Sequence, residues 1–366
     1  MKAYFTLLFE KVRNFMSIDK RYTIKQVANI AGVSTQTISR VINNRSDVAV
    51  ETRAHIEHII KKLNYRPSAL ARSLIRQRSF TLGVVTAGLS FSGPSSTLNG
   101  IVSKADELGY TILLKELPRF DSYHAESLLD TLLAWPVDGI IWAAPEVGNN
   151  HTWVDKRLTN IKAPVVFLNM ESRPGLSIIN DDNFHGAKMA TTHLLKQGYR
   201  RIGHLSGPLD WWESRQRKAG WQQALAEAGI AVLDSHTAAG DWTSSSAEAS
   251  FCRLQHQYPN MDAVFVANDQ MALGVLKLLS EQGVAVPEQV GVVGFDGLAE
   301  AAYYWPALTT VVQDHHLLGC TAVKEIVSTI EHLHGEDILP APRTVLLKPQ
   351  LLVRKSSVRQ LVGESN

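Results

Sequence analysis

This chain of 366 residues is poor in cysteine and contains no long apolar run. Its two cysteines, Cys252 and Cys320, lie far apart and form neither a C-x-x-C pair nor a metal-ligand spacing, which argues against a disulfide framework. We therefore expect two ordinary core thiols, no metal and no cofactor. Because no stretch of about twenty apolar residues occurs, we predict no helix that spans a membrane.

The short motifs of several common enzyme sites are also missing. The chain has no G-x-x-x-x-G-K-[ST] loop, no G-x-G-x-x-G after the first predicted strand, no H-E-x-x-H and no nucleophile elbow. Its thirteen histidines are scattered and show no spacing typical of a catalytic or metal site. An enzyme, such as a sugar kinase or hydrolase, is therefore a disfavoured class, and we predict that the chain is not an enzyme.

A clear targeting signal is absent from the N-terminus. Residues 3–9 are apolar, but charged residues interrupt them at once and no small-residue cleavage site follows clearly. We therefore expect the protein to stay in the cytoplasm. Residues 1–19 form an extension before the first motif, and Met16 is an alternative start.

Positive and negative side chains are nearly equal in number over the whole chain, but they are unevenly distributed along it. The net charge is +2, yet residues 20–78 contain twelve Lys or Arg against three acidic residues, and the chain from residue 79 onward is net acidic. Clustered Lys and Arg are attracted to nucleic-acid phosphates. The distribution therefore predicts a basic head that binds nucleic acid and an acidic body that does not.

Residues 23–43, TIKQVANIAGVSTQTISRVIN, predict two short amphipathic helices joined by a tight turn at Gly32. Ser34 has the position of an N-cap for the second helix. The outward face of that helix carries Thr35, Gln36, Ser39 and Arg40. This pattern is typical of a helix-turn-helix whose second helix enters the major groove of DNA.

Two groups of residues in this motif are assigned to DNA. The residues expected to face base edges are Thr35, Gln36 and Arg40. The residues expected to contact phosphates are Thr23, Ser34 and Asn43. Good bidentate base contacts contribute roughly 1 to 3 kcal/mol of discrimination each, whereas phosphate contacts mainly set the register. Gln36 and Arg40 should therefore determine most of the sequence preference.

A third amphipathic helix at residues 50–63 completes a three-helix headpiece. After it, Ser68 could cap a short helix over residues 69–76 within a linker. A helix of this length is marginal alone in water, so we expect it to become ordered on DNA or against a second copy.

From residue 81 the pattern changes to buried strands that alternate with helices, which favours an α/β core of parallel sheets. The predicted strands are residues 81–86, 111–114, 139–142, 165–168, 202–205, 263–266 and 290–295. The predicted helices are residues 94–108, 122–133, 184–196, 212–228, 244–256, 269–282 and 315–334. These are too many for one small sheet, so we expect two similar lobes. Short strands at residues 344–347 and 350–353 suggest that the chain recrosses between them.

Ligands of open α/β sheets bind beyond the carboxyl ends of the strands. Asn268 and Asp296 each end a predicted strand, Glu146 follows another, and Arg217 lies on the helix after a fourth. Amide, carboxylate and guanidinium groups around a cleft suit a ligand with many hydroxyls. The sequence therefore favours a sugar as the ligand.

Aromatic faces would complete such a sugar site. Trp242, in the segment G-D-W, is the first candidate, and Phe91, Trp211 and Trp212 are further ones. Taken singly, each of these tryptophans could instead be an ordinary core or surface residue.

The headpiece pattern V-A-x-x-A-G-V-S-x-x-T-I-S-R-V-I-N resembles the helix-turn-helix of the lactose-repressor (LacI/GalR) family of transcription regulators. V-A-N-D-Q-M-A-L-G, G-D-W, V-G-F-D and L-T-T-V-V-Q-D resemble the same family, so the resemblance extends from residue 23 to about residue 354. It implies an α/β protein with an N-terminal all-α headpiece and a two-lobed periplasmic-binding-protein-like core of doubly wound parallel sheets. Three crossings would join the lobes, with an effector in the cleft.

The resemblance also implies domain boundaries. The headpiece takes residues 20–65 and the hinge helix or linker residues 66–79. The first lobe takes residues 80–179 and 314–341, and the second lobe takes residues 180–313 and 342–366.

By position, the resemblance places Arg217, Asn268 and Asp296 on sugar hydroxyls and Trp242 on the stacking face. Leu74 matches the leucine that wedges between base steps in the minor groove. The sequence departs from its relatives at Val147, which aligns with an aspartate and follows Glu146, and at His315. We keep Glu146 and His315 as candidate effector contacts in a remodelled pocket, together with Phe91.

The partners implied by the resemblance are double-stranded operator DNA, a mono- or oligosaccharide effector and a second copy in a homodimer, with no membrane. A dimer is expected because the C-terminal leucine heptads of tetrameric relatives are missing. Sugar binding would release a repressor from its operator. The alternatives are a periplasmic-type sugar-binding protein and a regulator that uses a non-sugar corepressor.

Overall fold

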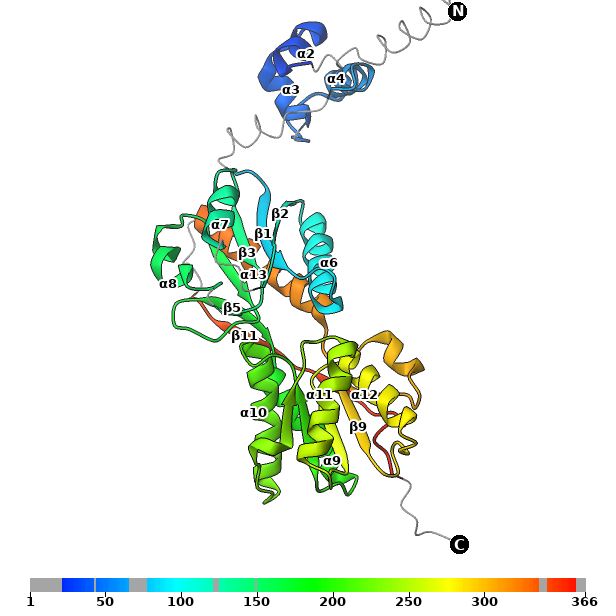
Figure 1. The fold of residues 1–366 in the computed structure, drawn as a ribbon. Coiled ribbons are helices and arrows are strands. Elements are labelled where there is room, and N and C mark those ends of the chain that lie inside the picture. The colour runs from blue at the N-terminus through cyan, green and yellow to red at the C-terminus, as the bar shows by residue number, and fades with distance from the viewer. Residues whose placement is uncertain are drawn as a thin grey trace, which may run out of the picture. The chain divides into compact units, whose positions relative to one another are not determined.

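A computed structural model describes residues 22–42, 44–65, 78–120, 125–148, 150–335 and 341–359. The chain divides into two compact units, residues 1–79 and residues 80–366, each of which is drawn in Figure 1. The predicted N-terminal extension and the linker helix at residues 69–76 lie outside the described residues. Within the described ranges, no helix is long and apolar enough to cross a membrane.

Three helices build the headpiece, as predicted: α2 (Ile24–Ala31), α3 (Thr35–Ile42) and α4 (Val50–Lys62). Their shared core consists of Val27, Ala28, Ala31, Ile38, Val41, Ile56, Ile59 and Tyr65. Gly32 ends α2 with φ 63°, a left-handed conformation that favours glycine. This turn is what allows α3 to follow α2 after only two further residues.

The first lobe of the core contains a parallel six-stranded sheet in the order β11-β5-β4-β3-β1-β2. Its strands are β1 (Thr81–Ala87), β2 (Thr111–Leu117), β3 (Gly139–Trp142), β4 (Val165–Leu168), β5 (Ser177–Asp181) and β11 (Thr344–Leu347). Its helices are α6 (Ser92–Glu107), α7 (Ala125–Leu133), α8 (Trp153–Arg157) and α13 (His315–His334). One apolar cluster includes side chains of α6 and α13, and a second includes side chains of α7 and α8, so helices cover both faces of the sheet.

The second lobe contains a six-stranded sheet in the order β12-β10-β9-β8-β6-β7, parallel except for the β10–β12 pair. Its strands are β6 (Ile202–Ser206), β7 (Thr237–Ala239), β8 (Ala263–Val266), β9 (Gly291–Asp296), β10 (Thr309–Val312) and β12 (Gln350–Leu352). Its helices are α9 (Asn183–Lys196), α10 (Trp212–Glu227), α11 (Ser244–Gln257) and α12 (Asp269–Glu281).

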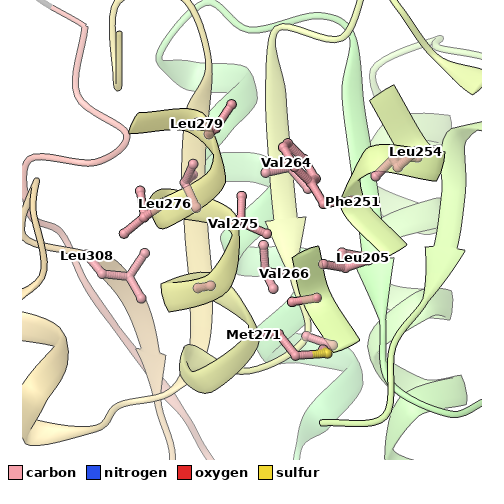
Figure 2. Close-up of a cluster of buried hydrophobic side chains, with 14 of the residues drawn as sticks. Leu205, Phe251, Leu254, Val264, Val266, Met271, Val275, Leu276, Leu279 and Leu308 are labelled. Atoms are coloured by element: carbon pink, nitrogen blue, oxygen red, sulfur yellow. The ribbon is translucent and has the colours of Figure 1, made fainter. Parts of the chain in front are cut away.

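Two apolar clusters cover the faces of this second sheet. One of them packs Val264 and Val266 of β8 against α11 and α12, as Figure 2 shows. The other packs Trp221 of α10 and residues of α9 against the opposite face. The doubly wound arrangement predicted for the core is therefore confirmed.

The chain passes between the lobes after β5, after β10 and after β11. The boundary expected before residue 342 is wrong, because β11 pairs with β5 from Thr344↔Ile178 to Leu347↔Asp181 and so completes the first sheet. A four-residue apolar stretch does not indicate which sheet it will join. The first crossing likewise follows Asp181, two residues later than expected, because β5 continues to that residue.

Most strands end within three residues of their predicted bounds, but β5, β7, β10 and the short helix α8 were not predicted. The missed strands have between three and five residues. Runs this short have too few alternating positions to show a pattern. Two of these strands, β5 and β10, lead directly into the crossings between the lobes, so residues at the crossings were not predicted either.

Candidate functional site

Helix α3 presents the predicted polar face to solvent: Thr35, Gln36 and Arg40 are all exposed. Ser34 caps the helix, and its Oγ accepts the N–H of Thr37 at 3.1 Å. Because caps and the headpiece core anchor α3 from behind, the exposed side chains are held by a rigid element rather than by a loop. Asn43 and Leu74, two further predicted DNA contacts, lie outside the described residues.

Thr23 begins α2 as one half of a capping box with Gln26. Its Oγ1 accepts the N–H of Gln26 at 3.4 Å, and its own N–H donates to Gln26 Oε1 at 2.9 Å. Arg40 lies 3.5 Å from Asp47 through Nε, with both side chains about half exposed. Exposed ion pairs contribute little, so Arg40 can exchange this partner for a base edge at small cost.

A cavity lies at the carboxyl ends of the strands of both sheets and is lined by residues of both lobes. Six of the seven predicted effector residues line it: Phe91, Arg217, Trp242, Asn268, Asp296 and His315. Other residues also line the cavity but were not predicted as effector contacts: Phe120, Asn183, Glu213, Gln270 and Gln313. Among the described residues, no group of three or more His, Cys, Asp or Glu side chains could hold a metal ion.

Glu146 is the predicted residue that does not line this cavity. Its buried carboxylate instead accepts from Arg173 Nη2 at 3.0 Å through Oε1 and from the N–H of Glu171 at 3.1 Å through Oε2. The prediction failed because it assumed that a polar residue near a strand end points into the cleft. Here both carboxylate oxygens are turned toward a neighbouring loop of the same lobe.

Arg217, buried on α10, is the centre of a hydrogen-bond network at the polar end of the cavity. Nε donates to Asn183 Oδ1 at 2.8 Å, Nη2 to Gln313 Oε1 at 3.1 Å, and Nη1 to Asp296 Oδ1 at 3.1 Å and to the Ala267 carbonyl. A guanidinium has five N–H groups. These bonds within the described residues use four of them, so one Nη2 hydrogen is left for a ligand.

Asn183 and Gln313 lie at the first two crossings between the lobes: Asn183 begins α9 two residues after the end of β5, and Gln313 directly follows β10. They are also bonded to each other, since Gln313 Nε2 donates to Asn183 Oδ1 at 3.2 Å. The rule that polar residues after strands form the site would have found both of them. It did not, because β5 and β10 themselves were not predicted.

Trp242 and Asp296 have left-handed backbone conformations, with φ 77° and φ 95°. This conformation is uncommon for residues other than glycine and is concentrated at functional sites. Asn268 supports Trp242, because its Nδ2 donates to the Trp242 carbonyl at 3.0 Å. The tryptophan ring also packs against Gly207, where an added Cβ would lie 2.3 Å from the ring. Asn268 therefore fixes the backbone that carries this ring, and Gly207 leaves the space that the ring occupies.

Four side chains lining the cavity have a buried polar atom with no hydrogen-bond partner among the described residues. The atoms are Glu213 Oε2, Trp242 Nε1, Gln270 Oε1 and His315 Nε2. Buried polar groups in folded proteins are nearly always hydrogen-bonded. A polar ligand in the cavity would supply the missing partners, since the four atoms include both donors and acceptors.

His315 begins α13 beside the end of β5, and its Nδ1 lies 3.3 Å from Asp181 Oδ2. Burial disfavours the charged imidazole, but the neighbouring Asp181 carboxylate outweighs burial, so the pKa of His315 is raised. This contact joins the end of β5 to the start of α13, at the point where two crossings meet.

Burial raises the pKa of two carboxyl groups near the cleft, Glu213 and Asp269, to about 7. Asp269 has a structural role, because Oδ1 accepts from Thr310 Oγ1 at 2.7 Å and Oδ2 accepts from the N–H of Leu298 at 2.8 Å. Glu213 lies in the cavity wall, one helical turn before Arg217.

Replacing Glu213 by glutamine is expected to weaken the pH dependence of stability. The raised pKa of Glu213 means that the folded chain binds more protons than the unfolded chain between about pH 4.5 and pH 7. The free energy of unfolding therefore falls as the pH rises through this window, by at most about 3 kcal/mol for a shift of this size. Urea denaturation should show Glu213→Gln to be more stable than the parent at pH 8 and equally stable at pH 4.

The exposed Glu288 offers a matched control, because the same substitution there removes a carboxylate that water already solvates. Glu288→Gln should follow the parent at both pH values. Equal behaviour of the two variants at pH 8 would mean that the carboxyl of Glu213 is not penalised by burial.

Comparison with known proteins covers both units of the chain. Residues 23–68 match the bacterial regulatory proteins of the lacI family, and residues 191–357 match the periplasmic-binding-protein-like domain. The lactose operon repressor of Escherichia coli strain K12 is 32% identical over 357 residues, which are 94% of this chain and 98% of that protein. The HTH-type transcriptional repressor PurR of Haemophilus influenzae strain PittEE is 31% identical over 91% of this chain and 98% of its own length.

Among solved structures, the lac repressor dimer bound to operator and the anti-inducer ONPF is similar to this chain with a TM-score of 0.83 and 31% identity. The match covers 93% of this chain and all of that one. The similarity therefore extends over the headpiece and over both lobes of the core.

Proposed function

The chain belongs to the LacI family of bacterial regulatory proteins, and from this premise we propose that it is a repressor released from its operator when a sugar binds between the two lobes. As a member of the family it is a DNA-binding transcriptional regulator. The sugar, the direction of the response, the homodimer and the cytoplasmic location are parts of the proposal, as is the absence of catalysis.

The observation that carries the proposal is the hydrogen-bond network of Arg217. It contains groups from the second lobe and from both of the first two crossings, through Asn183 and Gln313. A ligand that contacts this network binds two arrangements of the lobes unequally, because the crossings change when the lobes rotate. Unequal binding is the requirement for a ligand to shift a conformational equilibrium.

The chemistry of the cavity supports a sugar rather than another effector. Asp296 and Asn268 supply carboxylate and amide groups that form paired hydrogen bonds with neighbouring hydroxyls, and Trp242 supplies an aromatic face. A non-sugar corepressor remains the second candidate, and it differs in its expected effect, since it would tighten operator binding.

At the operator, we propose that Thr35, Gln36 and Arg40 face base edges and that Thr23, Ser34 and Asn43 contact phosphates. Leu74 would wedge between base steps in the minor groove, at a cost of a few kcal/mol of unstacking that the additional contacts offset. The similarity to a repressor dimer bound to operator supports the use of two headpieces on one site.

The test begins with selection of a duplex from a random library by the full chain. Fluorescence anisotropy then follows the binding of that duplex across a panel of sugars and nucleobases, and a thermal-shift screen of the same panel reports binding directly. A ligand at 100 times its Kd stabilises the folded state by about 2.7 kcal/mol. The proposal predicts that at least one sugar raises the melting temperature and weakens operator binding. Sugars that leave both readouts unchanged would contradict it, and a nucleobase that tightens operator binding would favour the corepressor.

A further inference from the structure

Four aromatic rings line the same cavity and follow one another across it: Phe91, Phe120, Trp211 and Trp242, here called the aromatic wall. The centroid distances between successive rings are 5.9 Å, 4.5 Å and 5.5 Å, with tilted or edge-on geometry. Phe91 and Phe120 belong to the first lobe, and Trp211 and Trp242 to the second. The wall is therefore continuous from one lobe to the other.

The polar end of the cavity is next to one end of this wall. The guanidinium carbon of Arg217 lies 5.5 Å from the centre of the Trp242 ring, and Asn268 is bonded to the Trp242 backbone. A single sugar ring held by Arg217 and Asp296 can stack on Trp242 alone. The other three rings extend beyond the reach of that sugar ring, so they offer apolar surface to another part of the ligand.

We propose that the effector is a two-ring glycoside, with its first sugar ring at the polar end and its second ring against Phe120, Trp211 and Phe91. This inference rests on the proposed function and specifies the class of sugar. The second ring can be another sugar or an aromatic aglycone, because both present a flat apolar face of similar size. A monosaccharide fills only the polar end.

The position of the second ring also connects it to the arrangement of the lobes. Phe120 and Trp211 contact each other across the cleft, and the backbone near them is paired as well, through a bridge between Val147 and Trp211 and a 3.4 Å hydrogen bond from the N–H of Trp212 to the Glu146 carbonyl. A ring that packs on this junction contacts both lobes at once. The second ring therefore strengthens binding and takes part in the release of the operator.

Matched ligands test the inference by isothermal titration calorimetry with the full chain. For glucose and for galactose, each with an α and a β linkage, the probes are the methyl glycoside, the phenyl glycoside and a disaccharide such as maltose, cellobiose, melibiose or lactose. The methyl glycoside has the same blocked anomeric oxygen but no second ring. We expect at least one series in which a second ring tightens binding by about tenfold or more, which corresponds to 1.4 kcal/mol or more.

Variants of the aromatic wall test whether its residues cause the tighter binding of two-ring ligands. Phe120→Leu and Trp211→Leu should each reduce the advantage of the second ring to about threefold or less, because leucine removes the aromatic face on which that ring packs. The affinity of each variant for the methyl glycoside is measured as well, so that the ratio of the two affinities isolates the effect of the second ring. Trp135→Leu is the control, since Trp135 is a 59% exposed tryptophan of the first lobe that does not line the cavity. The circular-dichroism spectrum and the urea denaturation midpoint of each variant show that it is folded.

The outcomes separate this inference from the proposed function. A methyl glycoside that binds as tightly as its two-ring partners overturns the inference and leaves the proposed function standing. A second-ring advantage that survives in both wall variants also overturns it. If no glycoside in any series binds, the inference fails, and the proposed function fails with it if the wider sugar panel also leaves melting temperature and operator binding unchanged.

Discussion

The substitution Arg217→Lys is expected to leave operator binding intact and to make it insensitive to the effector. Lysine keeps a positive charge near Asp296, so this partly buried carboxylate retains a partner. It cannot reproduce the planar fork that reaches Asn183, Gln313 and Asp296 at the same time. The effector would lose the hydrogen bond from the remaining Nη2 hydrogen and the bond to Asp296, whose carboxylate the fork positions. Since hydrogen bonds to charged groups contribute about 1.5 to 3 kcal/mol each, loss of both should weaken effector binding by about 100-fold or more.

The measurement is anisotropy of a labelled operator duplex during titration with the effector identified by thermal shift. In the parent protein the effector lowers operator affinity, and in the variant the same titration should have no effect below about 100 times the parent's midpoint. Lysine at this position also leaves buried polar groups without hydrogen-bond partners. We therefore expect the free energy of unfolding to fall by about 2 to 4 kcal/mol.

A second arginine on the same helix provides the control. Arg215 is exposed and donates to the backbone carbonyls of Leu209 and Asp210, away from the cavity. Arg215→Lys should respond to the effector as the parent does. If Arg217→Lys also responds normally, then the cavity assignment is wrong, whatever the stability of the variant.

The substitutions Gln36→Ala and Arg40→Ala are expected to remove sequence preference while non-specific binding to DNA persists. Both side chains are exposed on α3, and alanine favours the helix, so the headpiece should remain folded. A lost base contact costs roughly 1 to 3 kcal/mol of discrimination, which corresponds to a reduction of about 5-fold to 150-fold in the ratio of specific to non-specific affinity. Competition between operator and scrambled duplexes at one fixed salt concentration measures this ratio.

The two variants should differ in their salt dependence. Arg40→Ala removes a charge and should lower the slope of log affinity against log salt if the arginine also neutralises a phosphate, whereas Gln36→Ala should not change the slope. His58→Ala, on the exposed side of α4, is the control for a change elsewhere on the headpiece. A specificity ratio that is the same in Gln36→Ala and His58→Ala would show that Gln36 does not read bases.

Much of the fold could be predicted because its signals are local. The headpiece helices depend on apolar residues three and four positions apart, on the Ser34 cap and on the turn at Gly32, all within twenty residues. The buried central strands β3, β4 and β8 were predicted to the residue, since each is a short and almost wholly apolar run.

The candidate site was predictable where a side chain follows a recognisable strand or belongs to a family motif. Asn268 and Asp296 are of this kind, and both line the cavity. Glu146 satisfied the same rule and failed, because its direction depends on Arg173, which lies 27 positions further along the chain. A rule based on neighbours in sequence has no access to that partner.

Sequence alone was therefore sufficient for the headpiece, for the alternation of strands and helices, and for the family, because each depends on short-range patterns or on motifs of a few residues. Folding in three dimensions was needed to place β11 in the first sheet, to bond Asn183 and Gln313 to Arg217, and to bury Glu213 in the cavity wall. Each of these features depends on groups that are distant in the chain and adjacent only in the folded core, where burial and hydrogen bonding select the partner.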